Sequence, residues 1–135
     1  MERDDETGAL AAAKYYVGLF EYVYLTGDLE AWNTLAAREC GFCEHVAEEV
    51  TSIHDAGGYR QYESFEFLGD PEIKKDPARK MFEVTLQANE GPSVEYDADG
   101  KIVNEAAGGP VDMTLGLVHE LGAWHVAGIL ASTSG

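Results

Sequence analysis

The chain has 135 residues, the length of one domain, and 45% of them are hydrophobic, which is enough for a core without metals or many disulfides. Nine basic residues against 25 acidic ones give a formal net charge of −16 at pH 7. A surface of this sign repels nucleic acid and anionic lipid headgroups, so the composition argues against both as partners and favours solubility.

The first predicted element is a helix over residues 9–26, which is apolar around nearly all of its circumference. Its clear polar positions are Lys14 and Glu21, seven residues apart on one stripe. Charges near both ends and the lack of roughly 20 uninterrupted apolar residues argue against a membrane span. We therefore predict a core helix around which a sheet curls.

The chain ends predict flexible tails around a single domain of residues 9–131. The acidic residues 1–8 and the small polar residues 132–135 supply few groups that a core could bury. The sequence as given contains no signal peptide, transit peptide or transmembrane segment.

Two shorter helices are predicted next, over residues 29–38 and 42–56. Asp28 can cap the first of them. In the second, apolar side chains recur at the three-four-seven spacing of a helix, and His54 lies on that apolar side. A Cys-Gly-Phe-Cys motif at residues 40–43 joins the two.

From Tyr59 onward, aromatic and β-branched residues alternate with polar ones, which predicts strands. The predicted strands cover residues 59–68, 79–89, 93–96, 101–104, 111–119 and 123–130. Two Asp-Pro pairs bracket residues 70–77, which are predicted to be a polar connection. Asp99-Gly100 predicts a hairpin turn. The clearest apolar stripes of the strands consist of Phe82, Val84, Leu86 and Ala88, and of Val111, Met113, Leu115 and Leu117.

Three helices followed by a run of strands is the α+β pattern, and the short connections require antiparallel neighbours. A strongly bent sheet would use the apolar surface of the first helix. We therefore predict three N-terminal helices packed in a strongly bent antiparallel sheet, which together form a cone.

Five stretches of the chain occur in a recognisable order: Ala13–Asp28, Cys40–Cys43, Ala56–Gly58, Asp97–Val103 and Gly122–Val126. In this order the chain resembles an uncharacterised family of actinobacterial lipoproteins (domain of unknown function 6318). It is also similar to the wider nuclear transport factor two-like, or SnoaL-like, cone-fold superfamily. The resemblance implies secretion and a lipid anchor on a cysteine upstream of residue 1, at the outer face of the cell membrane. It implies no particular activity.

The two cysteines leave three interpretations open. Cys40 and Cys43 could form a structural disulfide that joins the second and third helices, and in an exported protein the pair would be oxidised. A redox-active pair is the second interpretation, although a thioredoxin-type motif follows a strand, whereas helices flank this one. A zinc site with His45 and His54 is the third, but two cysteines are few for a structural site.

The first helix carries five aromatic residues that could line a pocket at the open end of the cone, or could simply form core: Tyr15, Tyr16, Phe20, Tyr22 and Tyr24. Ketosteroid isomerases of the superfamily pair an acidic base with a tyrosine in such a pocket.

Acid–base candidates on the strands are Glu83, Asp112, His119 and His125. Asp112 and His125 lie opposite the clearest apolar stripes, which favours solvent-facing positions. His54 is expected to be a hydrogen-bonded histidine of the core or its boundary. No nucleophile elbow, phosphate loop or metal-binding run occurs, and no cofactor is predicted.

The sequence leads us to expect a non-catalytic, extracytoplasmic lipoprotein domain that binds a small apolar ligand or another envelope protein. The alternative is an isomerase- or dehydratase-like enzyme that uses Tyr15 or Tyr22 with Asp112 or His125. A thiol–disulfide protein that uses Cys40 and Cys43 is the second alternative. A homodimer is possible in such folds.

Overall fold

A computed structural model describes residues 5–78 and 80–133 of the chain. It contains three helices followed by seven strands: α1 (Glu6–Thr26), α2 (Glu30–Leu35), α3 (Gly41–Asp55), β1 (Tyr59–Tyr62), β2 (Phe65–Asp76), β3 (Met81–Glu90), β4 (Ser93–Tyr96), β5 (Ile102–Ala106), β6 (Gly109–Glu120) and β7 (Ala123–Thr133). The predicted fold class is confirmed: an α+β domain whose N-terminal helices pack on antiparallel strands.

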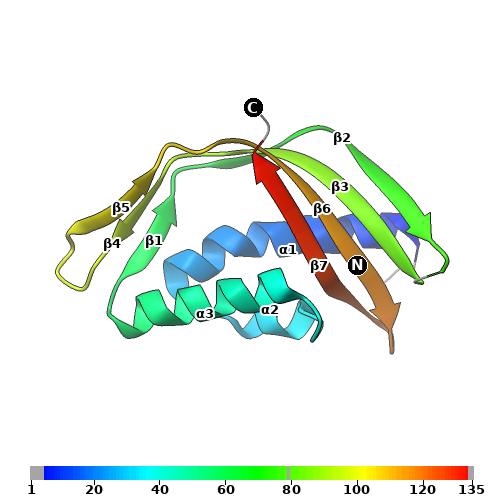
Figure 1. The fold of residues 1–135 in the computed structure, drawn as a ribbon, viewed down its shortest axis with the longest axis horizontal. Coiled ribbons are helices and arrows are strands. Elements are labelled where there is room, and N and C mark those ends of the chain that lie inside the picture. The colour runs from blue at the N-terminus through cyan, green and yellow to red at the C-terminus, as the bar shows by residue number, and fades with distance from the viewer. Residues whose placement is uncertain (1–4, 79, 134–135) are drawn as a thin grey trace.

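The strands form two sheets, one of order β1-β4-β5 and one of order β2-β3-β6-β7, and every pairing in them is antiparallel. The sheets continue into each other, because β1 runs on into β2, β3 into β4 and β5 into β6. Two backbone hydrogen bonds hold the corner: Glu63 N donates to Pro92 O (2.9 Å) and Gly91 N donates to Ser64 O (2.8 Å). The result is a bent surface that arches over the helices (Figure 1).

Helix α1 begins at Glu6, three residues before its predicted start, because the Asp5 side chain caps it by accepting a hydrogen bond from Gly8 N (3.1 Å). The predicted acidic tail therefore shrinks, and residues 1–4 lie outside the described part of the chain. The helix ends at Gly27, whose φ of 77° suits the left-handed cap.

Helix α1 is a core helix beneath the bent sheet, but only one of its faces is covered. One face is buried against the sheets and α2, whereas Tyr15 and Tyr22 on the other face are both 45% exposed. Because α2 and α3 stand to one side of α1, they leave this second face uncovered (Figure 1).

Helices α2 and α3 lie close to their predicted ranges, although α2 ends three residues early, at Leu35. The chain then runs along the edge of β7, where Ala36 pairs with Val126 and Ala37 N donates to Val126 O (2.9 Å). This strand-like segment sets the position at which α3 begins.

The prediction for residues 59–77 is wrong in part. The single strand predicted over residues 59–68 is divided at the corner into β1 and β2. The polar stretch 70–77 is not a connection, since β2 continues to Asp76 and absorbs Asp70-Pro71 in a bulge between Leu68 and Glu72.

The apolar stripes of β3 and β6 face the helices as predicted, and Val84, Leu86, Leu115 and Leu117 are buried. Strand β7 adds Trp124 and Val126 to the same core and extends to Thr133, beyond its predicted end. The alternation thus fixes an inner sheet face toward the helices and an outer face toward solvent.

Candidate functional site

Aromatic side chains fill the space between α1 and its neighbours. Tyr16 stacks on Trp32 with 4.0 Å between ring centroids, and Phe20 lies 5.6 Å from Tyr62 and 4.9 Å from Tyr24. Tyr16 and Trp32 are almost completely buried. Among the described residues the Tyr16 hydroxyl has no hydrogen-bond partner, and burial strongly raises its pKa. The predicted aromatic set therefore contributes three core residues, Tyr16, Phe20 and Tyr24.

The open end of the bent sheet is held by a polar network centred on Arg60 of β1, whose side chain is 17% exposed. Its guanidinium lies 3.2 Å from Glu49 Oε1 of α3 and 2.7 Å from Glu95 Oε1 of β4. It also lies over the ring of Tyr24, 4.7 Å from the centroid, while the Tyr24 hydroxyl donates to Glu49 Oε1 (2.7 Å). Arg60 of β1 thus joins α1, α3 and β4.

The network shifts the titration of its members. Burial alone would lower the pKa of Arg60, but hydrogen bonds to Glu95 and Tyr62 raise it overall, so the side chain stays charged. Burial raises the pKa of Tyr62, and hydrogen bonding with Arg60 partly opposes the rise. Arg60 therefore stays positively charged and Tyr62 stays neutral, and in these states the two side chains can hydrogen-bond.

Two carboxyl groups beside this network, those of Glu21 and Glu90, have raised pKa values. Burial raises the pKa of Glu21 on α1, and the charge of Glu90 raises it further. Burial also raises the pKa of Glu90, against the influence of Arg60. Oε1 of Glu21 is buried without a hydrogen-bond partner in the described part of the chain. Both groups thus favour the neutral form more than an exposed glutamate does.

Two hollows lie next to Arg60 at the open end of the bent sheet, and together we call them the mouth. A hollow of about 150 Å³ is lined by Tyr62, Glu90 and Ser93, and a wider one of about 530 Å³ by His45, Glu49 and Ser52; Arg60 and Asn104 line both. Charged and amide side chains line much of the mouth, which does not suit an apolar ligand.

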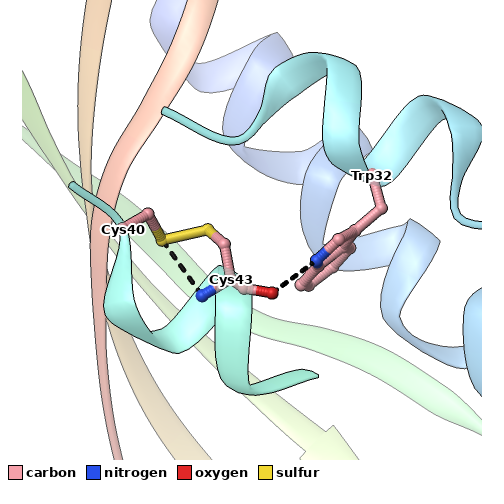
Figure 2. The surroundings of a disulfide bond; sticks show 3 residues. All are labelled: Trp32, Cys40 and Cys43. Carbon is pink, nitrogen blue, oxygen red and sulfur yellow. Dashed lines mark hydrogen bonds between the residues drawn. A yellow bond between two sulfur atoms is a disulfide. The ribbon is translucent and has the colours of Figure 1, made fainter. Parts of the chain in front are cut away.

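The structure contains a disulfide bond between Cys40 and Cys43, which closes the N-terminal turn of α3. Trp32 Nε1 of α2 donates to Cys43 O at 3.0 Å, next to the sulfur bridge (Figure 2). Since Trp32 also stacks on Tyr16, this corner ties α1, α2 and α3 together.

The redox and metal interpretations find little support in this arrangement. Cys40 is 1% exposed and Cys43 2%, so neither sulfur is open to attack by a thiolate. In residues 5–78 and 80–133, no three His, Cys, Asp or Glu side chains are placed to hold a metal ion. His54 instead makes a hydrogen bond from Nε2 to Tyr24 O (2.8 Å), as expected for a boundary histidine.

The structure does not bring the predicted catalytic candidates together. Tyr15 lies on the exposed face of α1, and so does Tyr22, whose hydroxyl donates to Asp28 Oδ2 (2.8 Å). Asp112 and His125 lie on the outer face of the sheet, since their register neighbours Gln87 and Val118 alternate with buried residues. The tyrosines and these strand residues are thus on different surfaces.

The other two strand candidates are also separated from each other. His119 faces the core edge-on to Trp124, with ring centroids 4.9 Å apart, and its Nε2 has no hydrogen-bond partner among the described residues. Glu83 faces outward. The groups that do converge at the mouth are Arg60, Glu49, Glu90 and Glu95. Arg60 could have been noticed as a rare basic residue in alternation with Tyr62.

An open groove of about 980 Å³, wider than the two hollows of the mouth, lies on the outside of the four-stranded sheet, and we call it the outer groove. Its floor is made of small residues of β6 and β7, including Thr114, Gly116 and Gly128. One wall is the segment between α2 and α3, and the groove reaches Leu130 on β7. His125 and Glu83 line it as well. The groove is thus a shallow surface feature rather than a cavity inside the cone.

No helix in the described residues has the length and apolarity to cross a membrane. No curated protein matches the sequence.

Comparison with solved structures finds the same fold in proteins of very different sequence. The chain is similar to the intermembrane space region of chloroplast protein ARC6, with a TM-score of 0.68 and 10% identity over 98% of this chain and 99% of that one. It is also similar to an uncharacterised Caulobacter vibrioides protein with a cystatin-like fold, with a TM-score of 0.56 and 11% identity over 96% of this chain and 91% of that one. At such identities the likeness concerns the fold alone.

The family comparison covers nearly the whole chain, from residue 1 to residue 129. It includes the disulfide, the Arg60 network and most of the outer groove. On this match, the chain belongs to the family of unknown function DUF6318.

Proposed function

We propose that this chain is the non-catalytic, extracytoplasmic domain of a cell-envelope protein and that it binds another protein through the outer groove. The observation that carries the proposal is the location of open space. The interior beside α1 is packed by stacked and tilted aromatic rings, whereas the outer groove of about 980 Å³ lies outside the sheet. An open, shallow surface suits a macromolecule better than a small ligand, which needs enclosure.

The arrangement of polar groups supports a binding role over catalysis. An acid–base enzyme needs a carboxylate or histidine within hydrogen-bond reach of the reacting group and of its helper. The two tyrosines expected for such a pocket lie on the exposed face of α1, whereas Asp112 and His125 lie on the outer face of the sheet. In the mouth, Arg60 is already engaged by Glu49 and Glu95. The alternative, a small-molecule site at the mouth, rests on Tyr62 and Glu90 beside the hollow of about 150 Å³.

The extracytoplasmic location rests on chemistry and resemblance. A buried disulfide between Cys40 and Cys43 suits an oxidising compartment. A lipid anchor on an upstream cysteine, as the family resemblance implies, would place the domain at the outer face of the cell membrane.

Site-specific photo-crosslinking in cells of the source organism tests the proposal. A photoreactive amino acid replaces His125 in the outer groove or, as control, Ile102, which is exposed on β5. We expect a discrete adduct with an envelope protein from position 125 and none from position 102. Equal adducts from both positions, adducts with lipid alone, or no adduct from position 125 would contradict the proposal. An adduct with a second copy of the chain would show that the outer groove serves homodimerisation and not the binding of a different protein.

A further inference from the structure

We propose that the free edge of β7 takes up an extended, basic segment of the partner as an additional strand. This inference rests on the proposed function and specifies how the partner is held. Strand addition supplies main-chain hydrogen bonds from the edge, and side-chain pockets beside the edge supply specificity.

The edge of β7 is covered at one end and open at the other. Strand β7 is the last strand of the sheet order β2-β3-β6-β7. Within the described residues, the segment at its outer edge pairs with it at a single point, Ala36 with Val126. Beyond that point, the strand continues from Ala127 to Thr133. Ala36 already pairs with Val126 in a parallel bridge, which shows that this edge accepts an extended chain.

The open part of β7 lacks the charges and prolines that protect sheet edges, and the bulge in its pairing with β6 lies at its first residue, Ala127. Residues 127–131 have the sequence Ala-Gly-Ile-Leu-Ala, without a charge or a proline, and Leu130 is 78% exposed. Long, uncharged edge strands recruit other strands, and proteins block them with charges, prolines or bulges unless pairing is intended. The segment 127–131 is therefore the place on this sheet where a strand is most readily added.

The opposite edge of the same sheet shows the contrast. Strand β2 carries Glu66, Asp70, Glu72, Lys74 and Lys75, together with a proline and a bulge. Charges and a proline, two of the devices that prevent edge pairing, are present there and absent from residues 127–131, whereas the bulge of β7 lies at Ala127 and its pairing with β6 is regular from Gly128 onward. The β2 edge is thus protected against an added strand, and the β7 edge is more accessible to one.

The charge of the surroundings selects a basic partner. The outer groove beside β7 is lined by the carboxylates of Glu39, Glu83 and Glu120, against one guanidinium, that of Arg38. The whole chain carries a formal charge of −16, which attracts a cationic segment over a distance of about a Debye length. The same charge opposes a second copy of the chain, because two acidic surfaces would meet. We therefore commit to a basic segment as the occupant.

Binding of defined peptides to the purified, unreduced domain tests this mode. The probe is a seven-residue peptide of alternating lysine and valine; the controls have proline at the central valine or glutamate in place of every lysine. We expect the probe to bind and both controls to bind about tenfold more weakly or not at all, since proline removes a ladder hydrogen bond. Binding should shift the NMR amide signals of residues 127–131 and leave those of β2 in place.

Two matched variants separate strand addition from simple attraction of charge. Leu130→Asp places a charge on the open edge, and Leu68→Asp places the same charge on β2, where Leu68 is 38% exposed. Strand addition predicts about fivefold or greater weakening in the Leu130→Asp variant and little change in the Leu68→Asp variant. Attraction of charge alone predicts equal or tighter binding in both variants, and that result would overturn the inference.

Three further results would also overturn the inference. They are the absence of probe binding to the wild-type domain, amide shifts confined to the mouth, and a wild-type dimer in light scattering that Leu130→Asp dissociates. Adducts from position 125 in cells, combined with failure of the peptide experiment, would leave the proposed function standing and remove this mode of binding.

Discussion

At the scale of single residues, the structure separates polar groups that stabilise the fold from one that opposes it. Glu21 lies on the core helix with one carboxylate oxygen buried and unpartnered among the described residues, and its pKa is raised by burial and then by the charge of Glu90. A carboxyl whose pKa is higher in the folded state binds more protons when folded. The folded state is therefore favoured at low pH and loses this advantage as pH rises through the raised pKa.

Replacement of Glu21 by glutamine is predicted to stabilise the protein at pH 7.5, because it removes the cost of burying the charge. The gain in melting temperature should shrink toward pH 4, where the wild-type carboxyl becomes neutral. Thermal unfolding at both pH values measures it, with Glu48→Gln on the exposed side of α3 as control. A Glu21→Gln variant that is less stable than wild type at pH 7.5 would contradict this account.

Whereas Glu21 opposes the folded state, Arg60 stabilises it. Its replacement by methionine leaves Glu49 and Glu95 without their common partner and is predicted to lower the free energy of unfolding by about 3 kcal/mol. Arg38→Met in the exposed segment after α2 should change it by less than about 0.5 kcal/mol. Urea unfolding measures both variants. Equal stabilities would mean that the network contributes nothing to the fold.

At the scale of elements, two glycines are required where the sheets meet. Gly108 has a φ of 76°, and a β-carbon there would lie 2.2 Å from Glu90 O; at Gly91 it would lie 2.3 Å from Ser64 Oγ. A side chain at either position would push apart the strands that form the corner.

Gly108→Ala is predicted to cost about 2 kcal/mol or more, through overlap and through its left-handed backbone. The matched control is Gly18→Ala on the exposed face of α1, where a β-carbon has open space; it should stabilise by up to about 1 kcal/mol. Chemical unfolding of the two variants gives both numbers. A harmless Gly108→Ala variant would show that the corner is not built as described.

The disulfide acts at the junction of the three helices. Replacement of Cys40 and Cys43 together by alanine should lower stability by about 2 kcal/mol through the unfolded state alone, since the closed loop is short. Because Trp32 donates to Cys43 O, its fluorescence should change as well. Unfolding followed by tryptophan emission measures both effects; an unchanged midpoint would argue that the bridge is dispensable.

The elements themselves could largely be predicted from the sequence, because their signals are local. The period of α3 and the alternation in β3 and β6 report which side chains are buried, and the buried residues agree. The continuation of β2 beyond Leu68 is not predicted because Asp70-Pro71 is a turn signal, while in the structure a bulge accommodates it within the ladder. Pairing with β3 thus outweighed a local preference.

At the scale of the whole molecule, the candidate sites were much less predictable. Arg60, Glu49 and Glu95 are 11 to 46 residues apart in sequence and meet through the register of β1 with β4 and the packing of α3. The outer groove likewise combines the segment after α2 with three strands. Such contacts depend on topology, which residue types and spacing do not specify.

The formal net charge of −16 fits the proposed binding of a basic segment. Arg60 is paired with Glu49 and Glu95, and the 25 acidic residues of the chain far outnumber its nine basic ones. An acidic domain with aromatic packing beside α1, an open outer groove and an uncharged edge segment at residues 127–131 is suited to hold a basic protein segment.

The measurement that tests this account most directly is the yield of the adduct from position 125 when either hollow is filled by tryptophan. Gly128→Trp fills the outer groove, where a β-carbon meets no atom within 4 Å, and Asn104→Trp fills the mouth. With equal amounts of folded protein, the account predicts that Gly128→Trp abolishes the adduct and Asn104→Trp leaves it unchanged. Loss of the adduct in the Asn104→Trp variant, with the Gly128→Trp variant unaffected, would place the functional surface at the mouth and contradict the account.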